Sequence, residues 1–251
     1  MPKLSVIVIS KNEAANIRAC LESVAWADEI IVVDSGSTDG TVELAREFTS
    51  HVYLHPDWPG FGPQKNRALD YAMGDWVLSI DADERVTPEL RIAIEAVMRN
   101  DANACVAYRV SRLSSYCGRY MRHSGWYPDR IVRLFRRNVA RFSDDLVHER
   151  LLIEGVIGQL DGELLHYAFD SAEEVLHKMD MYSTAGAQRL HQQGRKATLT
   201  GAVLRGMWSF FRTWVLRAGF LDGREGFMLA ISNAEGTYYR YIKLMQLNRR
   251  S

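Results

Sequence analysis

Residues 4–13 read LSVIVISKNE, and this stretch decides the fold. The run from Leu4 to Ile9 is apolar and rich in β-branched residues, which is typical of a strand buried on both faces. Polar residues end this strand, and residues 13–26 then carry apolar side chains at helical spacing. We therefore expect a buried strand, a polar loop and a helix at the start of the fold.

The same alternation of strand and helix continues to about residue 100. The sequence predicts strands at 29–33, 52–54 and 76–80, and helices at 41–48, at 65–73 and after Thr87-Pro88. Such alternation indicates a mainly parallel sheet with helices on both faces. Ligands bind beyond the carboxyl ends of the strands of such sheets, so we expect the chemistry in the loops that follow the strands.

The composition is that of a globular protein. The 251 residues are 47% hydrophobic and 25% charged, enough to build a core and too apolar for a disordered chain. Thirty-one basic residues balance thirty-one acidic ones, so no overall field attracts nucleic acid. Three cysteines without a CxxC pair favour a reducing compartment, and no apolar run resembles a signal peptide or a spanning helix. We expect a cytoplasmic protein.

Two carboxylates follow the strand expected at residues 76–80. Asp81 and Asp83 are one residue apart, and the small Ala82 leaves room for both to face the ligand crevice. Magnesium and manganese ions take oxygen ligands, commonly one or two carboxylates together with substrate phosphates. The pair therefore predicts a metal-bound phosphorylated donor; the alternative is an ordinary surface turn, where aspartate is common.

Asp34 and Lys65 are further candidates for donor binding. A carboxylate at Asp34 could accept hydrogen bonds from a ribose hydroxyl or a base N–H, although helix capping or turn formation within residues 35–39 is the commoner role of such an aspartate. Lys65 lies near the start of a helix, where phosphate is attracted, and is otherwise a solvated lysine.

Four stretches occur in an order that resembles family 2 glycosyltransferases with the GT-A fold. They are LSVIVISKNE (4–13), VVDSGSTDGT (32–41), KNRAL (65–69) with GDW (74–76), and DAD (81–83). The resemblance implies an α/β, Rossmann-like, mixed but mainly parallel sheet. It also implies that Ser10, Glu13 and Asp34 hold the nucleotide, that Lys65 lies near the donor, and that Asp81 and Asp83 serve the donor and a magnesium or manganese ion. Ser35 departs from the pattern, because many members have a second aspartate there.

Three later motifs resemble a bacterial subgroup that acts on lipopolysaccharide core, often described as β-glucosyltransferases. They are RLFRR (133–137), DDLVHE (144–149) and LLHY (164–167). The resemblance implies an inverting enzyme that transfers a sugar, with glucose from UDP-glucose the best candidate, to the inner core or a related lipid-linked acceptor. Inversion requires one in-line displacement with a base on the acceptor hydroxyl.

Glu149 and Asp145 are the candidate bases. We prefer Glu149, because the neighbouring His148 can support a carboxylate through a hydrogen bond; the alternative is an ion pair between Glu149 and Arg150. His166 could complete the metal shell, but a histidine among apolar neighbours is more often a core residue.

Residues 109–137 contain eight arginines and one acid, Asp129. We expect Arg130 and Arg133 to assist the departing diphosphate, and the whole run suits an acceptor that carries phosphate or acidic sugars. A solvated face is the ordinary alternative.

We expect three parts: a nucleotide-sugar-binding half at 1–110, an acceptor and base part of the same domain at 111–170, and a helical region at 171–251. Residues 203–221 place apolar side chains on one side of a helix and arginines on the other. This pattern predicts either a helix at a membrane interface or one packed on the catalytic domain. With a lipid-linked acceptor, we favour peripheral association with the inner face of the cytoplasmic membrane.

Three other functions share parts of this pattern. A sugar nucleotidyltransferase would carry a glycine-rich loop after the first strand, but residues 10–13 read SKNE. A phosphatase with an aspartyl nucleophile carries its DxD motif on the first strand rather than on a later one. A non-catalytic protein that binds sugar nucleotides would have no need of Asp81 and Asp83.

Overall fold

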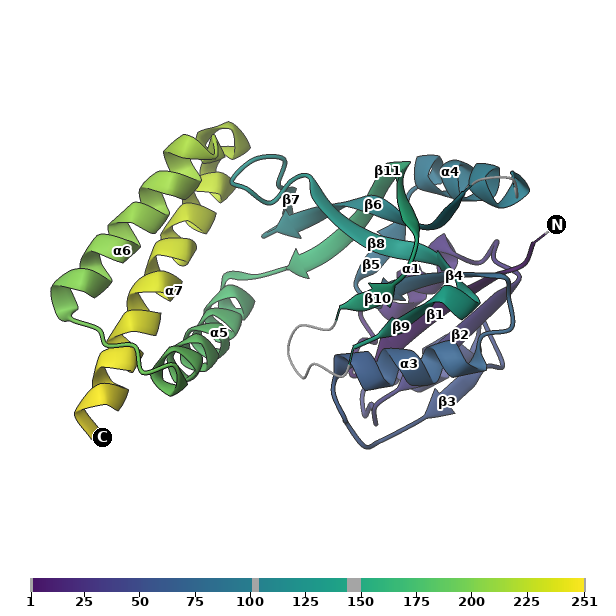
Figure 1. The fold of residues 1–251 in the computed structure, drawn as a ribbon, viewed down its shortest axis with the longest axis horizontal. Coiled ribbons are helices and arrows are strands. Elements are labelled where there is room, and N and C mark those ends of the chain that lie inside the picture. The colour runs from purple at the N-terminus through teal and green to yellow at the C-terminus, as the bar shows by residue number, and fades with distance from the viewer. Residues whose placement is uncertain (1, 101–103, 144–149, 251) are drawn as a thin grey trace. The chain divides into compact units, whose positions relative to one another are not determined.

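The computed structural model describes residues 2–100, 104–143 and 150–250. The chain forms two compact units: residues 1–112 with 129–166, and residues 113–128 with 167–251. The first unit combines a sheet with helices, and the second is mainly helical (Figure 1). The boundaries differ from those expected from the sequence, because residues 113–128 group with the helical unit.

The first unit begins with alternating strands and helices. These are β1 Leu4–Ser10, α1 Ile17–Ser23, β2 Glu29–Asp34, α2 Thr41–Arg46, β3 Val52–Leu54, α3 Phe61–Tyr71, β4 Trp76–Asp81, β5 Glu84–Val86 and α4 Pro88–Arg99. The remaining strands are β6 Cys105–Tyr116, β7 Arg119–Tyr120, β8 Asp129–Arg136, β9 Ala140–Phe142, β10 Leu151–Ile153 and β11 Val156–Phe169. Of these, β6 and β11 continue into the second unit, and β7 belongs to it.

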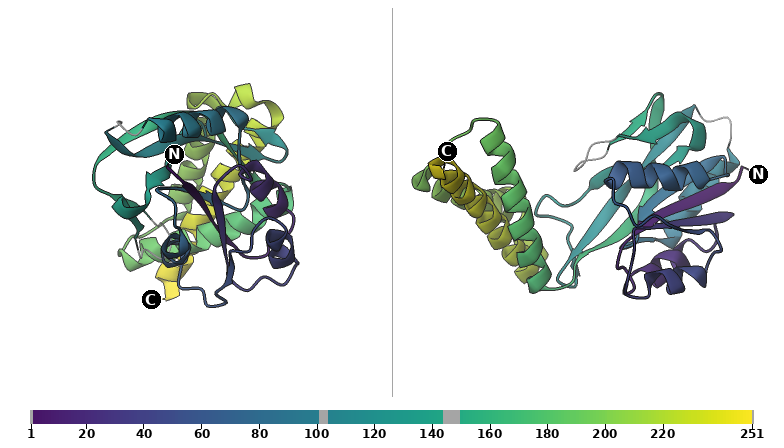
Figure 2. Two further views of the ribbon diagram at one scale, coloured as in Figure 1. Left: turned by 90° about the vertical axis from the view of Figure 1, so that its right-hand side faces the viewer. Right: turned by 90° about the horizontal axis from the view of Figure 1, so that it is seen from below.

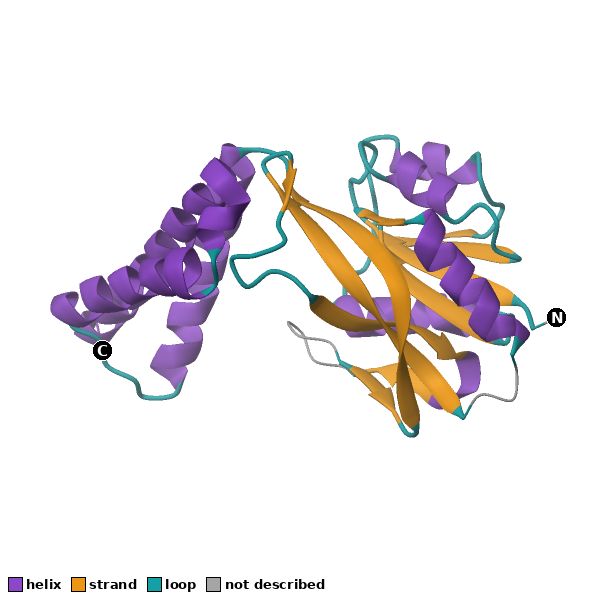
Figure 3. Ribbon diagram, turned by 90° about the horizontal axis from the view of Figure 1, so that it is seen from above, coloured by secondary structure: helices purple, strands orange, loops and turns teal. Residues whose placement is uncertain are grey.

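The main sheet is mixed, with the order β3-β2-β1-β4-β8-β6-β11-β5. Figure 3 shows its strands in orange and the helices in purple. Strands β3, β2, β1 and β4 run parallel, whereas β8 is antiparallel to both β4 and β6. β1 lies in the middle of the parallel part, which explains why its residues are apolar on both faces. The parallel sheet predicted from strand and helix alternation is confirmed in this half.

Helices cover both faces of the sheet, as expected. Val6 and Val8 of β1 share a core with α1 and α4, while Ile7 points to the opposite core with α3. Thr87 caps α4 by accepting a hydrogen bond from the Leu90 N–H (3.3 Å), and Pro88 occupies the first turn. This packing holds the carboxyl ends of β1, β2 and β4 at one edge of the sheet.

The second unit contains the long helices α5 Ala172–Gln192, α6 Leu199–Phe211 and α7 Gly223–Arg250, with α6 and α7 side by side (Figure 2). A π-helical turn at Arg212–Leu216 and a 3-10 turn at Gly219–Asp222 connect α6 to α7. The single helix expected at 203–221 is therefore wrong, because Ala218 adopts a left-handed conformation (φ 51°) that ends it. Within the described ranges, no helix is long and apolar enough to cross a bilayer.

Candidate active site

Asp34 organises the loop after β2. Its carboxylate is fully buried and accepts hydrogen bonds from the Gly36 and Ser37 N–H groups (2.9 and 2.8 Å) and from the hydroxyls of Ser10 (2.9 Å) and Ser37 (2.5 Å). Ser10 and Asp34 are register partners at the ends of β1 and β2. Asp34 thus has the turn-forming role considered above, and it also lines a hollow of about 380 Å³ beside Thr38.

Asp81 lies at the end of β4, the other parallel neighbour of β1. Its two carboxylate oxygens contact different cations: Lys65 Nζ lies 3.0 Å from Oδ1, and Arg133 Nη2 lies 2.5 Å from Oδ2. Burial opposes ionisation, but the charges of Arg133 and Lys65 outweigh it and hold the pKa of Asp81 well below its usual range. The Asp81 side chain remains 32% exposed, so this ionised carboxylate is open to a ligand.

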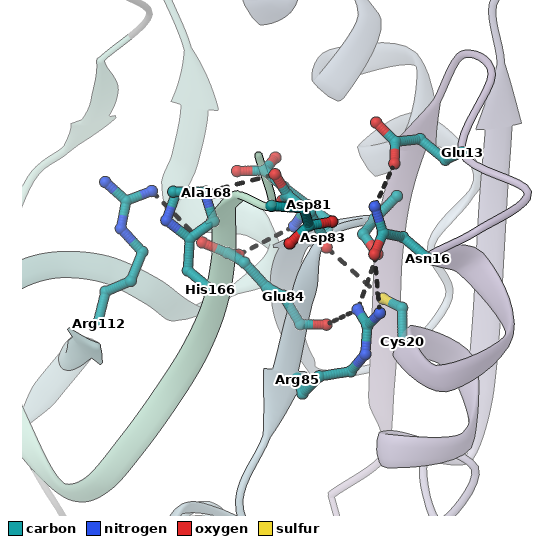
Figure 4. Close-up of polar contacts among 12 residues, drawn as sticks. Glu13, Asn16, Cys20, Asp81, Asp83, Glu84, Arg85, Arg112, His166 and Ala168 are labelled. Carbon is teal, nitrogen blue, oxygen red and sulfur yellow. Dashed lines mark hydrogen bonds and ion pairs between the residues drawn. The ribbon is translucent and has the colours of Figure 1, made fainter. Parts of the chain in front are cut away.

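Arg133 owes its position to a third carboxylate. Glu84 is fully buried on β5, and its side chain contacts Arg133 Nη2 at 2.6 Å. It also accepts a hydrogen bond from the Asp81 N–H at 3.0 Å, and Figure 4 shows Glu84 beside Asp81. Burial alone would lower the pKa of Arg133, yet Asp81 and Glu84 raise it, so the guanidinium stays charged. Arg112 adds a weaker contact to Glu84 at 3.5 Å while pairing with Asp129 at 2.7 Å.

Asp83 faces a histidine. The antiparallel pairing of β11 with β5 places His166 opposite Glu84, and His166 Nε2 lies 3.4 Å from Asp83 Oδ2. Both side chains are partly exposed, at 18% and 26%. A carboxylate oxygen beside an imidazole nitrogen is a donor pair that a divalent ion accepts, with further positions left for phosphate oxygens and water. The described residues contain no cluster of three or more histidine, cysteine or acidic side chains that could hold an ion without such help.

A chain of contacts ties the first motif to the DAD turn. Arg85 donates hydrogen bonds to the carbonyls of Ala82 and Glu84 (both 2.9 Å). Arg85 also donates to Asn16 Oδ1 (3.2 Å), and Asn16 donates to Glu13 (3.0 Å), as Figure 4 shows. Glu13 is thus linked to the DAD turn through Asn16 and Arg85. This chain holds the turn between β4 and β5 against the loop after β1.

Helix α3 links the two ends of this edge. Gln64 donates to the Ser35 hydroxyl (2.9 Å), next to Asp34, while its neighbour Lys65 pairs with Asp81. Both α3 side chains are buried. Asp34 and Asp81 therefore belong to one connected edge, although the hollow that Asp34 lines does not include Asp81 or Asp83.

Other predicted residues lie elsewhere or outside the described ranges. Arg130 is exposed on β8. The described cations that contact Asp81 are Lys65 and Arg133, so the structure does not bring Arg130 to Asp81. Glu149, Asp145 and His148 fall within residues 144–149, outside the described residues. The eight arginines are divided between the two units, because Arg119 and Arg122 belong to the helical unit.

Sequence reasoning missed Glu84, Gln64, Asn16 and Arg85. An acid directly after DAD was visible, but its burial depends on the pairing of β5 with β11, which no local pattern reveals. Cys20 also lies here, and its thiol contacts the Asp81 carbonyl at 3.5 Å. Burial raises the pKa of this thiol, so it stays protonated and is no nucleophile.

Comparison with known proteins agrees with the sequence motifs. Residues 5–161 match the model of the family described as Glycosyl transferase family 2. Glycosyltransferase RP128 of Rickettsia prowazekii (strain Madrid E) is 32% identical to this chain, covering 100% of it and 89% of the relative. The lipopolysaccharide core biosynthesis glycosyltransferase LpsC of Rhizobium meliloti (strain 1021) is 29% identical, covering 98% of this chain and 94% of the relative.

A solved structure is similar over a smaller part. Glucosyl-3-phosphoglycerate synthase from Mycobacterium tuberculosis, in complex with Mn2+, UDP-glucose and phosphoglyceric acid, is 26% identical over 45% of this chain and 44% of its own, with a TM-score of 0.39. The family match and the α/β sheet define a glycosyltransferase of the GT-A type. The chain belongs to glycosyltransferase family 2.

Proposed function

We propose that this glycosyltransferase is an inverting enzyme that transfers a sugar to the lipopolysaccharide inner core or a related lipid-linked acceptor. Glucose from UDP-glucose is the first donor to test. The similarity to LpsC, named for lipopolysaccharide core biosynthesis, supports the acceptor class. The observation that carries the reaction is the DAD turn, where Asp81 is held ionised by Lys65 and Arg133 while Asp83 faces His166.

The two aspartates have different roles in this proposal. Asp83 and His166 would hold a magnesium or manganese ion, which when bound supplies Lewis-acid stabilisation of the diphosphate leaving group. Both oxygens of Asp81 already contact cations, so we assign Asp81 to the donor and not to the metal. The remaining lone pairs of Asp81 accept hydrogen bonds from hydroxyls of the sugar nucleotide, and Lys65 and Arg133 hold the carboxylate in place.

Transfer is a single displacement. The acceptor oxygen forms a bond to the anomeric carbon as the bond from that carbon to the diphosphate breaks, and the nucleoside diphosphate leaves with the electron pair. A carboxylate base takes the proton of the acceptor hydroxyl. We assign this base to Glu149, with Asp145 as the alternative.

The helical unit supports association with a membrane. Helix α6 packs its small residues, Ala202 and Gly206, towards α7, while its large apolar residues face outward. The exposed ones are Val203, Leu204, Met207, Trp208 and Phe211, followed by Val215 and Leu216 in the π-turn. Exposed arginines at 205, 212 and 217 accompany them. Apolar and aromatic side chains beside cations suit the interface of an anionic bilayer, and this is where a lipid-linked acceptor resides.

The donor assignment is tested by thermal unfolding with a panel of sugar nucleotides, with and without manganese. A donor at one hundred times its Kd stabilises the native state by about 2.7 kcal/mol. We expect Asp83→Ala to lose the manganese-dependent part of this stabilisation. The control Asp70→Ala, which removes an exposed carboxylate paired with Arg141, should keep it. An unchanged manganese effect in Asp83→Ala would refute the metal assignment.

The base is tested by Glu149→Gln with a radiolabelled donor. This variant should keep donor-dependent stabilisation and lose transfer by about 100-fold or more, as expected when a general base is removed. Near-normal transfer would move the role to Asp145, to be checked with Asp145→Asn. Release of pyrophosphate or free phosphate, instead of nucleoside diphosphate, would indicate a nucleotidyltransferase or a phosphatase.

A further inference from the structure

The helical unit contains an open cavity of its own. Its volume is about 750 Å³, and side chains of α5, α6, α7 and the segment from Tyr116 to Trp126 line it. Ligand sites commonly have volumes of roughly 300–1,000 Å³ and often lie between the helices of a bundle. The cavity is therefore large enough for a small ligand or for the head of a larger one.

All charged residues among the described lining are cations. They are Lys178, Arg205, Arg212, Arg217 and Arg240. Two of these are already engaged: Lys178 pairs with Glu174 at 2.6 Å, and Arg205 lies over the Tyr241 ring at 4.6 Å. Within the described part of the chain, the guanidinium groups of the other three form no ion pair with a carboxylate, and Arg240 Nε is buried without a hydrogen-bond partner. Three arginines thus concentrate positive charge that this unit does not neutralise.

The backbone aligns two of these arginines. Arg212 and Arg217 lie at the ends of the π-turn, where the Arg217 N–H donates to the Arg212 carbonyl at 2.9 Å. In an α-helix, residues five apart would be rotated by about 140°, but in a π-turn, closed by a hydrogen bond between residues five apart, they lie on the same side of the helix. The irregular turn therefore directs both arginines to the same cavity.

Glycines leave space for the guanidinium groups. A Cβ atom at Gly186 would lie 2.9 Å from Arg240 Nε, and one at Gly125 would clash with Arg217. Gly125 has a positive φ of 81°, but Gly186 lies inside α5, where alanine is the better helix former. The glycine at position 186 therefore leaves space for the Arg240 side chain, and the helix itself does not require it.

We propose that this cavity binds a phosphate monoester carried on an amphiphilic molecule. Arginines bind phosphate oxygens through paired N–H donors, and three unneutralised guanidinium groups favour the higher charge of a monoester over a diester. The apolar part of the ligand packs on aromatic lining residues, which include Trp126, Phe169 and Trp208. This binding site goes beyond the transferase reaction, and its test requires neither donor nor turnover.

The test is calorimetric titration of the full chain with dihexanoyl phosphatidic acid below its micellar concentration. We expect it to bind at least tenfold more tightly than glucose 6-phosphate, dihexanoyl phosphatidylglycerol or dihexanoyl phosphatidylcholine. Arg212→Gln/Arg217→Gln/Arg240→Gln should weaken binding at least tenfold. The matched control, Arg189→Gln/Arg195→Gln/Lys196→Gln, removes the same charge from exposed positions of this unit outside the cavity and should change affinity no more than about twofold.

The variant Gly186→Ala tests the site independently, should the triple arginine variant fail to fold. We expect it to keep or raise the thermal unfolding midpoint and to weaken binding at least threefold, because Arg240 must move. Equal losses in the two triple variants, or unchanged affinity in Gly186→Ala, would overturn the proposed site. If glucose 6-phosphate bound as tightly as phosphatidic acid, the ligand would not need an apolar part, and the proposal of an amphiphile would be wrong. If phosphatidylglycerol bound as tightly, the site would not select a phosphate monoester over a diester. Asp83→Ala should bind like wild type, so failure of the transferase assignment would leave this result unaffected.

Discussion

Asp81 has the most constrained charge in the site. Two cations contact its oxygens, and Glu84 fixes one of those cations from the buried side. Removing the Asp81 carboxylate would leave buried Lys65 and Arg133 with less compensating charge, which is more costly than losing an exposed pair. The carboxylate is therefore preorganised in its ionised form before any ligand arrives.

This charge balance predicts how stability depends on pH. The folded pKa of Asp81 lies below its unfolded value of about 3.9, so the unfolded chain binds the proton first as pH falls. The contribution of Asp81 is therefore complete above the unfolded pKa and is lost as pH falls towards the folded pKa. We expect Asp81→Asn to be less stable than wild type at pH 6 and to lose less stability between pH 6 and pH 3, measured by urea denaturation.

Asp70→Asn is the control, because the carboxylate that it removes is exposed and its ion pair with Arg141 is screened by solvent. It should lose stability with falling pH much as wild type does. Asp39 and Asp57, whose pKa values are also lowered by hydrogen bonds, remain in all three proteins. Parallel pH profiles for wild type and Asp81→Asn would contradict the assignment of this dependence to Asp81.

At the residue scale, the sequence identified the chemistry but not its supports. Asp81, Asp83 and Lys65 were visible as polar side chains next to predicted strand ends or helix starts. Arg133 was expected near the donor, yet its ion pair with buried Glu84 depends on β8 and β5, which are distant in sequence. Local patterns report which residues end an element and not which other elements approach it.

At the scale of elements, α6 reverses the usual pattern of a helix in water. Gly206 and Ala202 are buried, whereas Met207 is 64% and Leu204 60% exposed. A Cβ atom at Gly206 would lie 3.2 Å from the Ala234 carbonyl oxygen of α7. Small residues therefore allow the two helices to approach closely, and the large ones are left for another environment.

This arrangement makes opposite predictions for two neighbouring residues. Gly206→Val should destabilise the protein by about 1–3 kcal/mol, because the new side chain meets the backbone of α7. Met207→Ala should change stability in water by no more than about 0.5 kcal/mol, because it alters an exposed position. Urea denaturation measures both. A larger loss for Met207→Ala than for Gly206→Val would show that α6 packs through its large residues instead.

Periodicity predicted the regular elements well and the irregular ones poorly. The strand at 52–54 and the helix after Thr87 were found with close boundaries, because apolar spacing and a cap define them. The end of the helix near Ala218 was missed, since alanine is a good helix former and only the backbone shows the break. The grouping of residues 113–128 with the helices depends on contacts such as Tyr116 with Ser232, at 2.9 Å, which periodicity cannot report.

At the scale of the whole molecule, the two units contain different kinds of surface. The DAD turn and its supporting ion pairs belong to the first unit, and the outward apolar face of α6 belongs to the second. If chemistry and lipid binding are divided in this way, each can be removed without the other. Asp83→Ala should abolish transfer but float with anionic liposomes like wild type.

The reverse variant is Met207→Ser/Phe211→Ser. Burying one large apolar side chain contributes roughly 1.5–3 kcal/mol, so losing two should reduce liposome binding at least tenfold. Donor-dependent stabilisation should stay unchanged, and transfer should fall more for a lipid-linked acceptor than for its soluble saccharide. The control is Met73→Ser/Ile92→Ser, which alters apolar residues of the first unit that are at least as exposed and should float normally. If the control loses liposome binding to the same extent, general surface hydrophobicity and not α6 accounts for the association.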